Sequence, residues 1–266
     1  MTGGPVITLL TDFGTADSYV AEVKGVLLTH APDAVLVDVT HEVAAGDVFA
    51  AQYLLARGWS RFPSGTVHLA VVDPGVGSAR RAIAARVSGH GFVAPDNGLL
   101  TPVLVGATVV ALPTPPGAAP TFHARDVFAP AAAALANGAP LVSLGVEIQD
   151  PVRRGLAGPE LQAGAMVGVV VHVDRFGTLV TNLPSECLAA DVRVEIAGRD
   201  AGPVERTFAD VPTGRLLALA GSGGTVEIAV RDGSAARTLG AATGTVVRVL
   251  SGVGDPGRLR HPAGGG

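Results

Sequence analysis

The hydrophobic pattern of the chain changes its period once, after Pro159, and this change constrains the fold more than any other feature. Before that point, short apolar runs typical of buried strands alternate with stretches whose apolar residues recur at helical spacing. After it, short β-rich runs follow one another, separated by glycine, aspartate and proline. Strands that alternate with helices favour a parallel sheet, whereas strands without helices favour a small barrel or sandwich. We therefore predict an α/β fold class, with an N-terminal α/β domain built on a largely parallel sheet and a C-terminal small β-barrel.

The pattern also places the elements and the domain limits. In the first part, strands are expected at 5–10, 34–39, 66–72, 91–95 and 108–112, and helices from residue 17, at 47–57 and at 126–137. In the second part, strands are expected at 166–173, 178–182, 192–196, 215–220, 225–230 and 245–250. We expect domains at 1–150 and 165–255, a linker rich in glycine and proline at 151–164, and a disordered tail at 256–266.

Composition argues against several classes of function. The 266-residue chain has a formal net charge of −4, and no run of lysine and arginine is longer than a pair, so binding to nucleic acid is not expected. Cys187 is the only cysteine, which excludes disulfides within the chain and favours a reducing compartment, the cytoplasm. The longest strongly apolar run, 163–171, is too short to span a bilayer, and the first apolar run does not resemble a signal peptide. No membrane partner is therefore predicted.

Motifs for the common cofactors are missing from the sequence. No glycine-rich dinucleotide fingerprint follows the first strand, and neither a phosphate-binding Walker loop nor a hydrolase nucleophile elbow is present. Six histidines have no partner at metal-ligand spacing, so neither a metal nor a cofactor is predicted. They are His30, His41, His68, His90, His172 and His261.

Acidic residues follow two of the predicted strands. Asp73, with Pro74 and Gly75, ends an apolar run and is followed by Arg80, as where a strand delivers charged groups to a cleft. Asp12 ends the first strand in the same way. Ligands of open α/β sheets bind outside the carboxyl ends of the strands, so both acids are expected on one rim. The alternatives are a plain turn for Asp73 and a helix N-cap for Asp12 or Asp17.

Three further segments allow both a functional and a structural interpretation. His123 lies just before an apolar helix, where backbone N–H groups are free, but it can equally be a structural histidine beside a capping pair. The segment 173–182 combines an acid, an aromatic ring and a glycine, which suits either a ring-binding loop or a tight hairpin. The segment 219–233 is either a pair of hairpin turns or a rim of backbone donors.

Taken together, these segments resemble one family over nearly the whole chain, the S-adenosyl-L-methionine (SAM) hydroxide adenosyltransferases. These are adenosine-forming SAM hydrolases related to fluorinating and chlorinating enzymes. The matching segments occur in the family's order and are 11–14, 38–41, 73–77, 94–100, 122–130, 174–182 and 227–230.

The resemblance implies a homotrimer whose active sites lie between the N-terminal domain of one subunit and the C-terminal domain of its neighbour. It implies a catalytic triad of Asp73, Arg80 and His123. The implied substrate contacts are Asp12 for the ribose, Asp17, Asp174 and Ser222 near the methionine end, Phe176, Thr178, Val230 and Arg231 on the adenine side, and Asn97 in the matching segment 94–100. Family members usually carry asparagine where this chain has Thr178, so one hydrogen bond to adenine is in question.

The implied reaction is attack of water on C5′ of SAM, which releases L-methionine and adenosine without a metal or redox cofactor. Arg80 is expected to stabilise hydroxide character, with His123 as proton acceptor and Asp73 orienting both. Two alternatives stay open. A halide adenosyltransferase is disfavoured because the triad is intact and residues 86–92 run directly into 94–97 without the extra loop of the halogenating relatives. A non-catalytic SAM or adenosine sensor would keep Asp12 and Phe176 without needing the triad.

Overall fold

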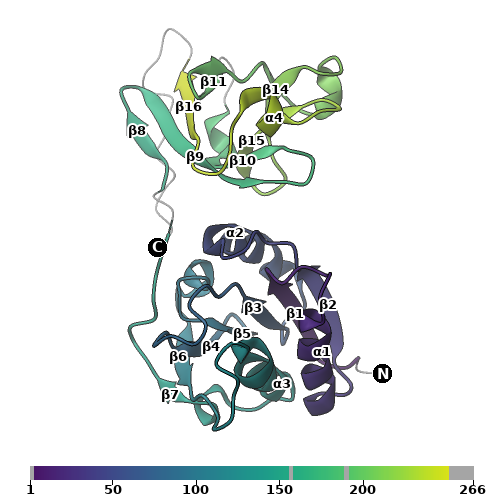
Figure 1. Cartoon of the computed structure of the whole chain (residues 1–266). Coiled ribbons are helices and arrows are strands. Elements are labelled where there is room, and N and C mark those ends of the chain that lie inside the picture. Colours follow the sequence, from purple (N-terminus) through teal and green to yellow (C-terminus); the bar gives the residue numbers. More distant parts are fainter. Residues whose placement is uncertain (1–2, 156–157, 189–191, 252–266) are drawn as a thin grey trace. The chain divides into compact units, whose positions relative to one another are not determined.

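The computed structural model describes residues 3–155, 158–188 and 192–251. The chain divides into two compact units, Met1–Gly155 and Leu156–Gly266 (Figure 1). The division falls inside the segment 151–164 that the sequence predicts as a linker. The tail predicted at 256–266 lies outside the described residues.

A seven-stranded sheet forms the centre of the N-terminal unit, in the order β2-β1-β3-β5-β4-β6-β7. The first four strands in this order run parallel, as the alternation of strands and helices predicts. The bounds of the seven strands are β1 Val6–Thr11, β2 Val35–Thr40, β3 Val67–Val71, β4 Ala82–Val87, β5 His90–Pro95, β6 Thr108–Leu112 and β7 Val146–Glu147.

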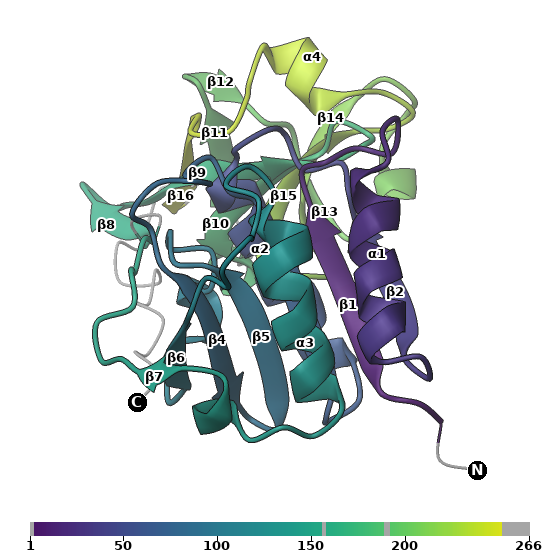
Figure 2. The ribbon, with the colours of Figure 1, turned by 60° about the horizontal axis from the view of Figure 1, so that its bottom comes forward.

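Helices cover both faces of this sheet (Figure 2). One face carries α1 (Tyr19–His30) and α3 (Ala129–Ala136), and the other carries α2 (Val48–Gly58). Successive residues of β1 show the two layers, because Leu9 belongs to the core cluster that includes α1 and α3, whereas Leu10 belongs to the cluster that includes α2. A strand buried on both faces reads as a continuous apolar run, which is why the sequence reveals it.

The N-terminal sheet as a whole is only partly parallel. The prediction of a largely parallel sheet is wrong for its second half. The strands β4, β6 and β7 pair antiparallel with their neighbours. The sequence pattern predicts neither β4 nor the hairpin that joins β4 to β5. The turn consists of Ser88 and Gly89, both at positive φ, 50° and 78°. Such a two-residue turn reverses the chain without a crossover helix.

The C-terminal unit contains one curled sheet of nine strands, which forms a half-barrel. The long strand β9 joins its two parts, because residues 165–169 pair with β16 and residues 170–173 pair with β10. Met166, Val194 and Ile228 are among its fully buried side chains. The predicted β-rich second part is therefore confirmed, as an open curled sheet. The bounds are β8 Glu160–Gln162, β9 Ala165–Val173, β10 Leu179–Pro184, β11 Val192–Ile196, β12 Arg199–Asp200, β13 Val204–Glu205, β14 Leu216–Ala220, β15 Thr225–Val230, α4 Ala235–Leu239 and β16 Val246–Ser251.

The segment predicted as a linker is bound at both of its ends. Asp150 accepts a hydrogen bond of 2.8 Å from Arg81, and the backbone N–H of Val152 donates to the buried carboxylate of Asp96 at 2.7 Å. Near the other end, β8 pairs with β9. Among the described residues, no helix combines the length and the apolar character that crossing a membrane requires.

Candidate active site

The loops that follow β1 and β3 meet at the carboxyl-end rim of the N-terminal sheet. Thr11 pairs with Val71 in the parallel register, so Asp12 and Asp73 leave neighbouring strands at the same edge. The backbone N–H of Gly46 donates to Asp12 Oδ2 at 2.8 Å, and Gly46 in turn lies against Pro74. The loops after β1, β2 and β3 are therefore in contact, as the rule for open α/β sheets predicts.

Asp73, Arg80 and His123 form one bonded cluster on this rim. The guanidinium of Arg80 binds both carboxylate oxygens of Asp73, from Nε to Oδ1 at 2.9 Å and from Nη2 to Oδ2. Nη2 also lies 3.1 Å from His123 Nδ1. The side chains of Arg80 and Asp73 are only 9% and 5% exposed, and Arg80 lies over the ring of Phe128 at 5.1 Å. This charge pair is thus held in a largely dry site, where it interacts more strongly than at the surface.

Two local features bring His123 to Arg80. Gly77 has a φ of 77°, and a Cβ atom there would lie 2.9 Å from the carbonyl oxygen of Pro120, so the loop after β3 approaches the segment before His123 closely only with glycine. His123 itself precedes a π-helical turn, η3 (Ala124–Phe128), that continues into α3. The helix predicted at 126–137 therefore begins earlier and with a different hydrogen-bond pattern. Turns of this kind recur at functional sites.

The surroundings of His123 fix which of its nitrogens carries the proton. Burial lowers the pKa of His123, and the nearby charge of Arg80 lowers it further, against the opposing effects of Asp73 and Asp126. The ring is therefore neutral at neutral pH. Arginine can only donate, so Nδ1 accepts from Arg80 and the proton of the neutral ring lies on Nε2. In this tautomer Nδ1, the one basic nitrogen of the ring, accepts from Arg80, and the role of His123 as proton acceptor stays a prediction.

Asp12 does not cap the following helix. The N-cap of α1 is Ser18, and neither Asp12 nor Asp17 bonds to the helix start. With Oδ2 held by Gly46, Asp12 Oδ1 makes no hydrogen bond to any residue in the described ranges. Asp17 is exposed. The side chain of Asn97 is used within the protein, since Nδ2 donates to the carbonyl of Val72 at 2.8 Å and Oδ1 accepts from Leu99 N at 3.1 Å.

In the C-terminal unit, Asp174, Phe176 and Thr178 share the loop between β9 and β10. The carboxylate of Asp174 accepts from the backbone N–H of Phe176 at 2.9 Å and of Thr178 at 2.8 Å, which is the turn chemistry of a tight hairpin. Phe176 projects from this turn with 76% of its surface exposed, whereas Thr178 is buried. A backbone bond from Ala236 N to Gly177 O, at 3.0 Å, sets the loop beside the start of α4.

The structure brings Val230 and Arg231 to the same end of the C-terminal sheet as Phe176, but not Ser222. Leu179, directly after the loop of Phe176, pairs with Ile228 near the end of β15, whereas Ser222 precedes the start of β15. The strand places these two ends about 17 Å apart. Arg231 donates to the carbonyl of Val211 at 2.8 Å, so its guanidinium is bound within the unit.

The segment 38–41 matches the family without a predicted role, and the structure shows what one of its residues contacts. His41 is 5% exposed, and its Nδ1 lies 2.8 Å from the hydroxyl of Thr11, the residue before Asp12. His41 directly follows β2, and Thr11 lies on the neighbouring strand β1, so no local sequence signal could have indicated this pair. No group of three or more histidine, cysteine, aspartate or glutamate residues that could hold a metal ion occurs in the part of the chain that the structure describes.

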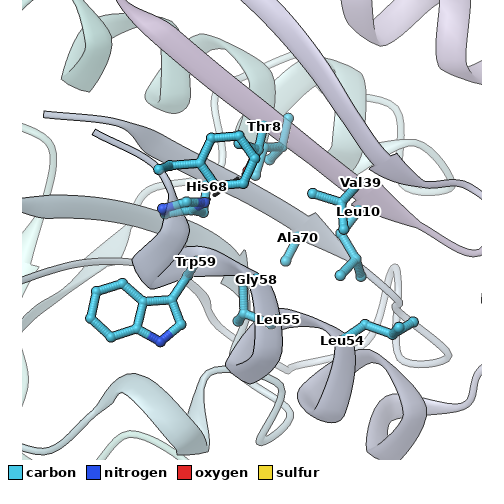
Figure 3. A pocket seen from close by; sticks show the side chains of 11 residues that line it. Thr8, Leu10, Val39, Leu54, Leu55, Gly58, Trp59, His68 and Ala70 are labelled. Atoms are coloured by element: carbon cyan, nitrogen blue, oxygen red, sulfur yellow. Dashed lines mark hydrogen bonds between the residues drawn. The ribbon is translucent and has the colours of Figure 1, made fainter. Parts of the chain in front are cut away.

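The N-terminal unit also contains a small cavity (Figure 3). Its volume is about 10 Å³, at the lower limit for one water molecule. Apolar side chains of β1 and α2 line it, together with Thr8, Trp59 and His68. None of the residues predicted to contact a substrate lines it, and it is too small for a nucleoside.

Comparison with known proteins covers both units. Family models described as the N-terminal and C-terminal domains of SAM hydroxide adenosyltransferase match residues 7–145 and 168–248. A Thermus thermophilus protein named (R)-S-adenosyl-L-methionine hydrolase is 44% identical over 260 residues, 92% of this chain and 99% of its own. A fluorinase of an Actinoplanes species is 33% identical over 68% of this chain and 72% of its own. The crystal structure of an uncharacterized conserved protein from Thermotoga maritima superposes with a TM-score of 0.86 at 35% identity, over 92% of this chain and 99% of that one.

Proposed function

Because this chain belongs to the family of SAM hydroxide adenosyltransferases, we propose that it is a SAM hydrolase, an enzyme that converts SAM and water to adenosine and L-methionine. The observation that carries the proposal is the cluster of Asp73, Arg80 and His123, a buried ion pair with a neutral histidine attached. The cluster lies on the rim beside Asp12, where a nucleoside would bind. A protein that only binds SAM has no need of such a cluster.

The cluster offers donors to an incoming oxygen. Arg80 uses three of its five N–H groups on Asp73 and His123, and Nη1 makes no hydrogen bond to the residues that the structure describes. His123 adds the proton of Nε2. Both carboxylate oxygens of Asp73 and Nδ1 of His123 accept from Arg80, whereas Nη1 of Arg80 and Nε2 of His123 donate to no atom of the cluster itself. Such a site stabilises a nucleophile with negative charge, and we propose that water reacts in it as hydroxide.

The reaction is then a direct displacement. Water releases its proton to solvent, hydroxide forms the bond to C5′, and the electron pair of the C5′–S bond leaves with the sulfur of methionine. Hydroxide and sulfonium neutralise each other as they react, so a site that excludes bulk water gains from their attraction. Neither a metal nor a redox cofactor enters this scheme, since the sulfonium is already a good leaving group.

Recognition of the substrate is divided between the two units in this proposal. Asp12 binds the ribose through its open Oδ1, and the exposed ring of Phe176 stacks on adenine beside Thr178. By resemblance, the methionine end of SAM is assigned to Asp17, Asp174 and Ser222. In this proposal, Asp174 acts there by shaping the turn between β9 and β10. Asn97 supports the rim rather than contacting substrate, since its amide already bonds to backbone on both sides.

We further propose a homotrimer in the cytoplasm whose sites combine the N-terminal unit of one subunit with the C-terminal unit of the next. Support comes from the family resemblance and from the division of the proposed contacts between two separate units. Co-assembly of His123→Ala with Asp174→Ala subunits should restore about a quarter of the wild-type activity, because random cyclic mixing leaves that share of sites intact. Mixed trimers without activity would contradict a shared site.

The function is tested by incubating the purified protein with SAM in water enriched in heavy oxygen, in the presence of a chelator. We expect adenosine and L-methionine in equal amounts, with the heavy oxygen on the 5′ carbon of adenosine. His123→Ala serves as the catalytically impaired control. A 5′-halogenated nucleoside on addition of chloride or fluoride would indicate the halide transferase, and SAM binding without any product would indicate a sensor.

A further inference from the structure

Two loops on the rim of the N-terminal sheet are tied together through His41. These loops are residues 12–15, after β1, and residues 41–46, after β2. Three hydrogen bonds join His41 and Gly46 to the chain around Asp12: Thr11 Oγ1 to His41 Nδ1 at 2.8 Å, Gly14 N to His41 O at 2.8 Å, and Gly46 N to Asp12 Oδ2 at 2.8 Å. His41 thus bonds on both sides of Asp12 in the sequence.

The far side of the His41 ring faces Asp38. Nε2 lies 3.1 Å from Asp38 Oδ1, a distance that allows an ion pair although the direction does not make a hydrogen bond. The other oxygen of Asp38 accepts from Lys24 of α1 at 2.6 Å. The order Lys24, Asp38, His41, Thr11 therefore runs from the surface of α1 to the residue before Asp12.

This arrangement leaves one atom of Asp12 open. Oδ2 is committed to Gly46, whereas Oδ1 has no partner among the described residues and is the atom that a ribose hydroxyl would meet. Its position depends on the backbone between Thr11 and Gly14, the stretch that His41 holds. We propose that His41 and Thr11 are positioning residues that set the affinity of the site for the ribose hydroxyls by fixing Asp12. This inference rests on the proposed function, because it assumes that the site binds a nucleoside.

The same strand contains a matched control for this inference. Thr8 also lies on β1, is 2% exposed like Thr11, and places its hydroxyl 2.8 Å from the Nδ1 of a buried histidine, His68. Thr8→Val and Thr11→Val both remove a buried hydroxyl from a bond to a histidine, and Thr11→Val also removes the bond of 3.3 Å from the backbone N–H of Phe13 to Thr11 Oγ1, which lies on the other side of Asp12. Only Thr11 is next to Asp12.

Calorimetric titration with adenosine separates the two. We expect Thr11→Val to weaken adenosine binding about tenfold and Thr8→Val to change it less than about twofold. Thr11→Ser, which keeps the hydroxyl, should restore wild-type affinity. Titration with 2′,3′-dideoxyadenosine should show no difference between Thr11→Val and wild type, since the hydroxyls that Asp12 would bind are missing. A merely structural role would weaken both nucleosides alike.

A double-mutant cycle completes the test. In the Asp12→Ala background, Thr11→Val should cause no further loss of adenosine affinity, because its effect passes through Asp12. Equal losses for Thr8→Val and Thr11→Val, or additive losses with Asp12→Ala, would overturn the inference. Product formation from SAM by the wild type is measured separately. If the wild type turns SAM over but the two affinity losses are additive, only the positioning role is rejected. If the wild type neither turns SAM over nor binds adenosine, the proposed function is rejected and this inference with it.

Discussion

Two polar clusters in the N-terminal unit contain neutral histidines but differ in what they leave open. On the rim, His123 accepts from Arg80, and Nε2 makes no hydrogen bond to any residue that the structure describes. In the core, both nitrogens of His68 are occupied, Nδ1 by the hydroxyl of Thr8 at 2.8 Å and Nε2 by His90 at 3.2 Å. The first cluster has hydrogen-bond donors left for a ligand, whereas the ring nitrogens of His68 in the second cluster are already hydrogen-bonded within the protein.

The electrostatic origins of the two neutral states also differ. His68 is neutral chiefly because it is buried, with a smaller contribution from His90, and its pKa is lowered to about 4. His123 is neutral because burial and an adjacent cation act together. Protonation of the core cluster therefore costs stability, whereas disruption of the rim cluster should cost catalysis. Substitutions in each cluster should therefore separate the two effects.

The largest effect is expected from the ion pair on the rim. Arg80→Met should lower kcat about 10³-fold, because it removes the main donor to the nucleophile and leaves Asp73 buried without a partner. Arg81→Met is the matched control, since Arg81 also pairs with a buried aspartate, Asp96, at 2.7 Å. The control should lose stability and keep kcat within about twofold of wild type.

Steady-state kinetics on both variants, with SAM affinity from calorimetry, measure this difference. Arg80→Lys is a second variant in case Arg80→Met misfolds. Lysine keeps the positive charge but cannot bind both carboxylate oxygens of Asp73 as arginine does. This variant should fold and still be strongly impaired. Similar kcat losses at Arg80 and Arg81 would mean that the rim cluster has no special role in catalysis.

The core cluster should make the protein sensitive to acid. The pKa of His68 falls from 6.5 in the unfolded chain to about 4 in the folded protein, so the unfolded state binds a proton first as the pH decreases. The free energy of unfolding should therefore decrease between pH 6.5 and pH 4, by about 3 kcal/mol for His68 alone. Above pH 6.5 this contribution to stability is fully present.

Urea unfolding across this pH range tests the linkage. His68→Gln should be less stable near neutral pH but should lose less stability on acidification than the wild type does. His30→Gln is a suitable control, since His30 is exposed at the end of α1. An unchanged pH profile in His68→Gln would show that other groups cause the acid sensitivity.

The rim cluster also shows which features of the site the sequence predicts and which it does not. The rim was predictable, since Asp12 and Asp73 end apolar runs and parallel strands share one edge. The tautomer of His123 was not predictable, because it depends on the contact between Arg80 and Nδ1. That contact requires the loop after β3 to lie close to Pro120, which only glycine at position 77 allows. The role of His41 was missed for a similar reason. Its partner Thr11 lies thirty positions away on a neighbouring strand, and no local pattern indicates that pairing.

The halves of the N-terminal sheet show the same limit. Strands β1 and β3 are mostly aliphatic and were predicted, whereas β4 is rich in alanine, which has little preference for strands, and contains Arg86. Missing β4 led to a sheet predicted as largely parallel. In the C-terminal unit, the sequence around Asp174 allows either a tight turn or ligand binding, and the backbone bonds to the Asp174 carboxylate are those of a tight turn.

The smallest expected effect distinguishes the two nitrogens of His123. The amide nitrogen of glutamine can take the place of Nε2–H, whereas the amide oxygen of asparagine can take the place of Nδ1. If donation from Nε2 is what the reaction needs, His123→Gln should keep about tenfold more kcat than His123→Asn, with similar SAM affinity in both. Kinetics at saturating SAM measure this, with melting temperatures to show that both variants fold. A more active His123→Asn would mean that the ring serves mainly to hold Arg80. Equal loss in both variants, to the level of His123→Ala, would instead indicate that His123 takes up a proton, and the rim cluster would then have to rearrange before it reacts.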